Sequence, residues 1–533
     1  MMSLSPGLNQ FMVLLFRRRW LIGVGLMTLC ALFLRTYQLT DLPSGLHGDE
    51  GVAGLEGLRI LREGYIGPYS WPAHGQPTGP LYLFALAEWA LGPTILAVRL
   101  VPALAGTLTI PLLFCLLRKD LGPGVALLSA GFLTVMEWHL HFSRIGFPVG
   151  TWPCFVLSAA AAITKAVERP NWVWWALAGA ATGLGIYIYN AYIVVSISVF
   201  VFISGYCLFS RTITGRRKWF CMSVFCLAFI LANIPMIRFA GDKNSGYFGH
   251  FKKVSVLDSD SWRRIDSPIK KAYFLLSRYA SFWGRLTWRP EVDFVDAAGV
   301  TPMVSPVIIL LAAVGMLKSI RRHRPPVVYL GIILVLIVPV AAVASMDGQY
   351  RRTLALVPFL AMLAALGAAE VSALVRTQRK AVRWIITGGL VVIISLMAGR
   401  SLQNYFIKFA HAPVQKWVFC QELTEACSYM TKFPPGFHFL FYSNRWSVDY
   451  ETRQFLAPKI SAEDRSVEFG RGGHDTSIDP AKGYPVFVFM GRYKLNLDLV
   501  RNNYPGGLTA SGTLTSDQAY LAYIPISSQC LKK

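Results

Sequence analysis

Charged residues are scarce in this chain. Asp, Glu, Lys and Arg make up 15% of its 533 residues, against about 25% in soluble domains. Acidic residues are the scarcer of the two charge types, with 29 Asp and Glu against 52 Lys and Arg. Apolar residues reach 54%. So little charge beside so many apolar residues excludes a disordered chain and argues against a soluble enzyme. We therefore expect an integral membrane protein.

Cysteine patterns that bind metals are also lacking. The nine cysteines form no CxxC pair and no His/Cys cluster with zinc spacing. The sequence therefore indicates no required cofactor and no metal ligands, and a divalent metal is possible but not indicated. Six cysteines fall in apolar runs, where they are typical small buried side chains. Cys420, Cys427 and Cys530 lie outside the runs, where a disulfide such as Cys427–Cys530 could form.

Long apolar runs are abundant. A membrane-spanning helix needs about 20 mostly apolar residues, and we count about eleven such runs, within a range of 10 to 13. They are Trp20–Leu34, 100–117, 124–142, 147–164, 172–189, 191–210, 219–237, 304–317, 327–345, 354–375 and 384–399. The run 80–91 is shorter, and we expect it to lie on the membrane surface. The fold class is thus a polytopic α-helical membrane protein.

The positive charge gives the orientation. Arg17, Arg18 and Arg19 precede the first span, and alternate connections at 118–119, 165–169, 211–218, 318–324 and 376–383 are short and basic. Cytoplasmic loops show this bias, so the N-terminus is expected in the cytoplasm of a plasma (inner) membrane. Most of the net +23 is then an orientation signal, and no nucleic-acid partner is needed to explain it.

The opposite, external side carries the long segments 36–99, 238–303 and 401–533. Residues 262–289 are rich in aromatics, Lys and Arg, which suits an interfacial helix. The tail has an amphipathic helical stretch near 414–431 and β-like runs at Phe437–Tyr442 and Pro485–Met490. We predict two domains, a membrane domain over 1–400 and a small external α/β domain over 401–533.

An acidic pair is the most unusual feature of the first external loop. Asp49 and Glu50 stand just before a helical pattern. Asp there could cap the helix, accepting backbone N–H bonds. It could equally be a general base held at the membrane face. The two roles are compatible, because a helix N-terminus also keeps a carboxylate ionised.

Four arginines stand at external ends of spans, namely Arg99, Arg144, Arg351 and Arg352. Such an arginine can simply extend to lipid headgroups. The external side is, however, the side that the positive-inside bias disfavours, and the guanidinium fork suits phosphate. Phosphate binding and headgroup contact therefore remain alternatives for these residues.

These motifs together resemble a known family. The order is a basic N-terminus, one span, the Asp-Glu loop, Gln76-Pro77-Thr78-Gly79-Pro80-Leu81-Tyr82, Arg99-Leu100-Val101-Pro102 and His141-Phe142-Ser143-Arg144. It is similar to the GT-C glycosyltransferases, in the branch of polyprenyl-phosphate-mannose protein mannosyltransferases and lipid A aminoarabinose transferases. The resemblance is specific over about 36–160 and covers 20–400 in topology. The family often has Asp soon after Ser-Arg, and Ile145-Gly146-Phe147-Pro148 lacks it, which points toward a metal-independent reaction.

The resemblance implies an enzyme that takes a sugar from a polyprenyl-phosphate carrier. Asp49 matches the catalytic base, Glu50 the second acid, and Arg99 and Arg144 recurrent positions at helix ends. We predict donor-phosphate binding by Arg99, Arg144, Arg351 and Arg352. Substrate contacts are expected from His47, Gln76, Tyr82, His141 and Tyr350.

The predicted reaction is transfer of a hexose or pentose to an acceptor hydroxyl or phosphate on a protein, lipid or glycan, with inversion. We expect inversion of the anomeric carbon because the sequence offers one candidate base and no separate nucleophile. The main alternative is a polytopic transporter or lipid flippase. Transporters place charges near the bilayer midplane, often in related halves. Here the charges stand at span ends, and no half-repeat is visible. A non-enzymatic scaffold that uses the tail is a third possibility.

Overall fold

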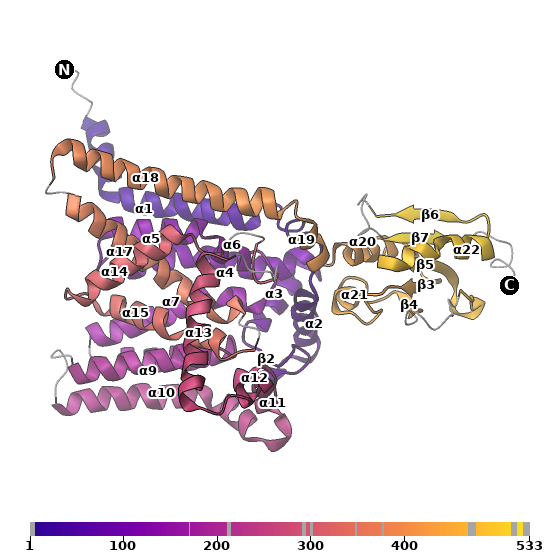
Figure 1. Ribbon diagram of the computed structural model, residues 1–533, viewed down its shortest axis with the longest axis horizontal. Coiled ribbons are helices and arrows are strands. Elements are labelled where there is room, and N and C mark those ends of the chain that lie inside the picture. The colour runs from indigo at the N-terminus through magenta and orange to yellow at the C-terminus, as the bar shows by residue number, and fades with distance from the viewer. Residues whose placement is uncertain are drawn as a thin grey trace. The chain divides into compact units, whose positions relative to one another are not determined.

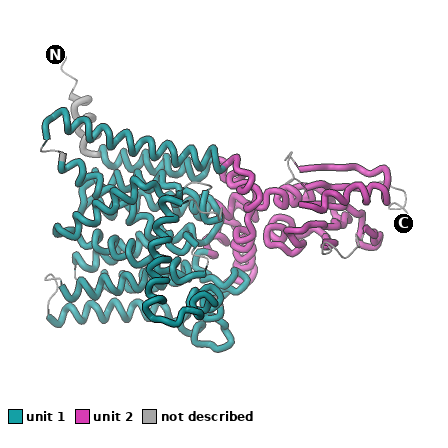
Figure 2. The backbone as a smooth tube through the Cα atoms, in the orientation of Figure 1, with its two compact units in different colours: residues 1–37, 65–80, 100–409 teal, residues 38–64, 81–99, 410–533 magenta. Residues whose placement is uncertain are grey.

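The computed structural model describes residues 6–169, 171–209, 215–289, 295–298, 302–346, 349–375, 378–466, 476–512 and 520–525. The chain forms two compact units (Figure 2), each made of separate stretches of sequence. Unit 1 comprises residues 1–37, 65–80 and 100–409, and unit 2 comprises 38–64, 81–99 and 410–533. The acidic loop thus belongs with the C-terminal region, whereas the sequence had suggested a single division near residue 400.

Long apolar helices make up most of unit 1 (Figure 1). Eight helical stretches of the described chain are long and apolar enough to cross a membrane. They are Arg19–Thr36 of α1 (Pro6–Thr36), α4 (Ile95–Leu117), Pro148–Glu168 with α7 (Trp152–Glu168), α9 (Tyr192–Phe209), α10 (Gly215–Gly241), Pro326–Val343 with α15 (Pro326–Ile337) and α16 (Val340–Val343), Tyr350–Leu374 within α17 (Val357–Val375) and its preceding 3-10 turn, and Lys380–Phe409 with α18 (Lys380–Gln403) and the π-helical turn Asn404–Phe409.

Three other predicted spans are shorter helices than expected. The run 124–142 is α5 (Pro123–Val135), which stops at the extended residue Met136 before α6 (Glu137–Phe142) begins. The run 172–189 is α8 (Trp172–Leu184) and a 3-10 turn, and 304–317 is α14 (Pro306–Ile320). A polytopic helical architecture is confirmed, and the number of eleven spans stays a prediction.

Glycines set the closest helix packing in unit 1. A Cβ on Gly179 of α8 would lie 2.2 Å from the Phe225 carbonyl oxygen of α10, and one on Gly183 would lie 2.9 Å from that of Phe229. Only a residue without a side chain allows the two backbones to come so near. The GxxxG pair in this span therefore serves helix packing.

The segments of unit 1 that were expected on the external side are short helices and one small hairpin. They are α11 (Tyr247–Val254), α12 (Asp260–Arg263), α13 (Pro268–Thr287) and the pair β1 (Tyr69–Ser70) and β2 (Gln76–Pro77). Ile269, Tyr273 and Leu276 of α13 are exposed at spacings that share one helix face. An apolar face with Lys and Arg beside it is typical of a helix that lies at a membrane surface, as predicted for 262–289.

Unit 2 combines two helices of the first external segment with the C-terminal α/β region. The former are α2 (Gly48–Glu63) and α3 (Leu81–Leu91). The latter contains α19 (Pro413–Val418), α20 (Gln421–Met430), β3 (Phe437–Tyr442), α21 (Glu451–Leu456), β4 (Ser461–Asp464), β5 (Tyr484–Phe489), α22 (Leu497–Asn503), β6 (Leu508–Ser511) and β7 (Leu521–Ile524). These elements confirm the helical stretch and both β-like runs expected in the tail.

The five strands form one sheet in the order β4-β3-β5-β7-β6. β3 is parallel to β4 and β5, and β7 is antiparallel to β5 and β6. Leu423, Cys427, Phe439 and Val488 lie in the core on one face of the sheet. Cys530, the possible disulfide partner of Cys427, lies outside the described residues.

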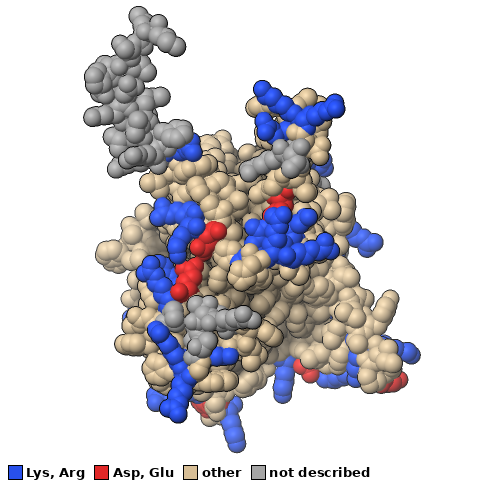
Figure 3. Space-filling model, turned by 90° about the vertical axis from the view of Figure 1, so that its left-hand side faces the viewer, with Lys and Arg blue, Asp and Glu red and all other residues tan. Residues whose placement is uncertain are grey.

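Lys and Arg side chains gather on the end of unit 1 that Figure 3 shows. Glu370 pairs with Arg322 and Arg324, and Glu168 pairs with Lys119. These residues come from the connections assigned to the cytoplasm, so the charge asymmetry deduced from sequence is present in the structure.

Candidate active site

The acidic motif forms the first turn of α2. The N-cap is His47, whose Nδ1 accepts the Asp49 N–H at 3.0 Å, while the Glu50 carboxylate accepts the His47 N–H at 2.9 Å. This reciprocal pair is a capping box. The helix is therefore capped by His47 and Glu50, and the capping role considered for Asp49 is wrong.

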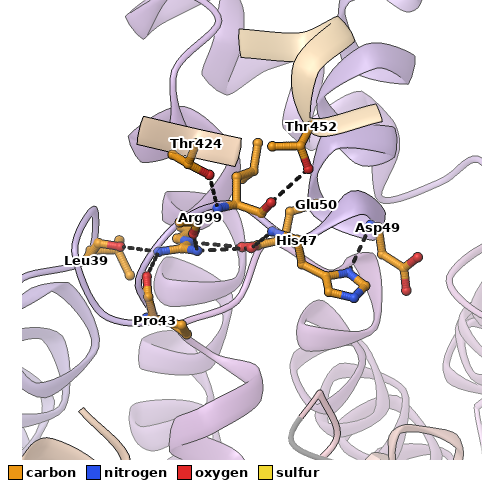
Figure 4. A network of polar contacts seen from close by, with 10 residues as sticks. Leu39, Pro43, His47, Asp49, Glu50, Arg99, Thr424 and Thr452 are labelled. Carbon is orange, nitrogen blue, oxygen red and sulfur yellow. Dashed lines mark hydrogen bonds and ion pairs between the residues drawn. The ribbon is translucent and has the colours of Figure 1, made fainter. Parts of the chain in front are cut away.

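Glu50 belongs to a buried ion pair. Its side chain and that of Arg99 are both fully shielded from solvent, with the Arg99 Nε 2.8 Å from Oε1 of Glu50. A second nitrogen of Arg99 donates to the other carboxylate oxygen at 3.0 Å. The remaining donors reach the carbonyl oxygens of Leu39, Pro43 and Gly45 (Figure 4).

This network changes the interpretation of two predicted site residues. A guanidinium has five N–H donors, and the five contacts of Arg99 use them within unit 2. No N–H remains there for a donor phosphate. Arg99 and Glu50 instead fix the fold of the loop 39–50, as buried charges do when fully paired.

Asp49 is oriented differently from Glu50. It is half-buried, and its carboxylate points away from the Glu50–Arg99 pair (Figure 4). Its position in the first turn of α2 places it at the positive end of the helix dipole, which favours the ionised form. Of the two acids, Asp49 is thus the one placed to act as a base.

Arg144 and His141 are buried within unit 1. Arg144 donates to the carbonyl oxygens of Leu34 and Tyr37, both at 2.6 Å, and its guanidinium lies over the ring of Phe406. His141 Nε2 lies 3.0 Å from the Val295 carbonyl oxygen. Neither side chain is exposed, so both hold the helix ends together in this arrangement.

The segment before α17 carries the other two arginines. Arg351 Nε donates to Asp296 at 2.7 Å, and Arg352 donates to Gln349 at 3.3 Å. Both remain partly exposed, whereas Tyr350 is fully buried against Trp138 and Phe282. Of the four predicted arginines, Arg351 and Arg352 are the two that keep partial exposure.

A cationic cavity on α13 was missed from sequence. Arg278 and Arg285 line a space of about 260 Å³ together with Ser281, Phe282, Ala342 and Val343. They are seven residues apart on an amphipathic helix, so they share one face. That spacing was the signal that could have identified them.

The other predicted contacts come from both units. Gln76 is half-buried on β2 of unit 1, paired with Ser70. Tyr82 is half-buried on α3 of unit 2.

Glu88 also lies on α3. It is buried against Gly57 of α2, and neither of its carboxylate oxygens has a hydrogen-bond partner in the described part of the chain. Burial raises the pKa of Glu88 to about 8.

This architecture resembles solved glycosyltransferases over nearly its full length. ArnT from Cupriavidus metallidurans bound to undecaprenyl phosphate is 14% identical, with a TM-score of 0.50 over 96% of this chain and 99% of that one. Archaeal oligosaccharyltransferase AglB from Archaeoglobus fulgidus, in complex with an inhibitory peptide and a dolichol-phosphate, is also 14% identical. Its TM-score is 0.51 over 97% and 75%. The chain has the GT-C fold.

The sequence supports this likeness over a shorter range. Residues 76–235 match the family model of dolichyl-phosphate-mannose-protein mannosyltransferases. No protein of curated function matches the chain significantly. The resemblance to GT-C enzymes that carried the sequence interpretation is thereby confirmed, as is the helical membrane architecture that goes with the GT-C fold.

Proposed function

We propose that this protein is an integral-membrane glycosyltransferase. It moves a hexose or pentose from a polyprenyl-phosphate carrier to an acceptor hydroxyl or phosphate on the extracytoplasmic side. The observation that carries the proposal is the position of Asp49, a partly exposed carboxylate in the first turn of α2 that is turned away from the buried ion pair.

Asp49 would act as the general base on the acceptor. Its carboxylate takes the proton of the acceptor hydroxyl while that oxygen bonds to the anomeric carbon. The bond from the anomeric carbon to the phosphate oxygen breaks, and the electron pair leaves with polyprenyl phosphate. One displacement at the anomeric carbon inverts its configuration.

Cations would stabilise the leaving phosphate. Positioned arginines lower the energy of developing negative charge, and Arg278, Arg285, Arg351 and Arg352 are the candidates in unit 1 that keep exposure or line a cavity. The solved relatives with undecaprenyl phosphate and dolichol-phosphate support a lipid carrier for this chain as well. The carrier's tail would remain in the bilayer.

The proposed reaction requires no divalent metal, although a metal remains possible. The short basic connections in the sequence support a cytoplasmic N-terminus and an external unit 2.

The test is a transfer assay with purified protein and a radiolabelled polyprenyl-phosphate sugar. We expect label to move to protein, lipid or glycan acceptors, and intact mass to identify the sugar. The product should carry the anomeric configuration opposite to that of the donor. Movement of intact labelled lipid across proteoliposomes without transfer would instead support the transporter or flippase alternative.

A further inference from the structure

Residues 44–46 of the acidic loop, just before α2, contact residues of the C-terminal region. Ser44 donates to the Gln415 side chain at 3.1 Å. Gly45 has a positive φ of 80°, and a Cβ there would lie 2.3 Å from the Phe419 carbonyl oxygen. The loop backbone therefore runs in direct contact with α19 and α20, within unit 2.

Leu46 is the centre of this contact. Its N–H donates to the Thr424 hydroxyl of α20 at 2.9 Å, and its carbonyl oxygen accepts the Thr452 hydroxyl of α21 at 2.8 Å (Figure 4). Leu46 and Thr452 are both completely buried. Buried peptide groups need partners, and here both partners are side chains that lie more than 370 residues further along the chain.

The first turns of α2 make a third contact. Gly48, Gly51 and Gly54 share one face of α2, and each would place a Cβ within 3 Å of α21 or the residue before it. Tyr450 has its hydroxyl against Gly48, Glu451 its backbone against Gly51, and Phe455 its ring against Gly54. Burial and nearby negative charge, including that of Asp49, raise the pKa of the Tyr450 hydroxyl.

We propose that the C-terminal region is a positioning element for Asp49, and that the Thr452 hydroxyl is the main contact through which it acts. This inference rests on the proposed function, because it assigns Asp49 the role of base. Only two residues, the N-cap His47 and Gly48, lie between Leu46 and Asp49. The position and direction of the first turn of α2 therefore depend on where Leu46 is held.

The test compares Thr452→Val with Thr452→Ser. Valine keeps the shape of the side chain and removes the hydroxyl, whereas serine keeps the hydroxyl. Thr431→Val is the matched control, because Thr431 is exposed in the same region and its hydroxyl bonds only locally, to the Ser428 carbonyl oxygen at 3.0 Å.

Two readouts are needed. Amide hydrogen exchange over residues 44–52 should become faster in Thr452→Val and remain as in the wild type in Thr452→Ser and Thr431→Val. In sugar transfer, kcat of Thr452→Val should fall about 10- to 100-fold, as misplacement of a catalytic group does, with donor KM unchanged. Added to Asp49→Asn, Thr452→Val should cause no further loss.

The outcomes separate the two proposals. Unchanged exchange over 44–52, wild-type kcat in Thr452→Val, or an equal loss in Thr431→Val would overturn the positioning role. A wild-type protein that transfers no sugar would overturn the proposed function instead, and the exchange measurement would still decide whether Thr452 holds the loop.

Discussion

Glu50 and Arg99 form an ion pair in which neither side chain is exposed and the nearest atoms lie 2.8 Å apart. Arg99 also donates to three backbone carbonyl oxygens of the loop 39–45. One guanidinium thus joins the start of α4 to the first turn of α2. The role of these two residues is to build the loop, whereas Asp49 beside them is half-buried with its carboxylate turned away from the pair.

Arg99→Lys should therefore destabilise the protein. Lysine keeps the charge but has three donors instead of five, and it leaves buried oxygens of the loop without partners. We expect the free energy of unfolding to fall by about 3–5 kcal/mol, the typical effect of disrupting a buried pair, measured by denaturation in detergent. Arg263→Ala is the control, because Arg263 forms an exposed pair with Asp258 worth about 0.5 kcal/mol or less. An equally stable Arg99→Lys protein with a higher donor KM would restore the phosphate-binding role.

Gly51→Ala should separate α2 from α21. The new Cβ would lie 2.9 Å from the backbone carbonyl of Glu451, and backbone cannot move aside as a flexible side chain can. Overpacking of this kind costs about 1–3 kcal/mol, which chemical denaturation would reveal. Gly388→Ala is the control, since a Cβ at Gly388 within α18 meets nothing within 4 Å. Equal stability of Gly51→Ala and wild type would show that α2 and α21 do not pack so closely.

Glu88 predicts a pH dependence of stability. Its pKa in the folded state is raised to about 8 by burial, above the value of about 4.3 for an exposed Glu. Between these values the folded state binds more protons than the unfolded state, so this group lowers stability as pH rises from about 4.3 to 8. Glu88→Gln should remove that slope, and should make the protein more stable than wild type at pH 8. Parallel stability curves for both proteins from pH 5 to 8.5 would contradict the assignment.

Arg285→Gln should weaken binding of the donor. Arg285 and Arg278 line the cavity on α13, and losing a charge-assisted bond of about 1.5 kcal/mol or more corresponds to at least a tenfold rise in donor KM. The change in kcat should be smaller than twofold. Arg289→Gln, which removes an exposed cation just beyond α13, is the matched control. If both variants raise KM equally, a general surface charge acts and the cavity does not bind the phosphate.

The sequence was informative about architecture for a physical reason. Apolar length, basic connections and the short β-like runs at 437–442 and 485–490 are local patterns that report burial directly. The acidic motif was equally visible, because Asp49 and Glu50 precede a helical pattern. Local patterns do not report which of two neighbouring acids faces inward, and the capping role of His47 depends on a contact that spacing alone does not reveal.

Long-range contacts account for what the sequence did not predict. Arg99 has the charge and the location of a phosphate ligand, and only its burial against Glu50, 49 residues earlier, shows otherwise. The contact of Leu46 with Thr452 joins residues 406 positions apart. For the same reason the acidic loop and the tail were assigned to different domains, although they form one unit.

The central claim is that Asp49 is the base, and the most direct measurement is kcat for sugar transfer by purified Asp49→Asn protein. Asparagine matches the carboxylate in shape but accepts no proton. Thermal melting and the exchange pattern of α2 should match wild type, since the His47 and Glu50 cap does not use the Asp49 side chain. We predict a loss of about 10²- to 10⁴-fold, the usual contribution of a general base. Transfer at the wild-type rate by folded Asp49→Asn protein would contradict the account.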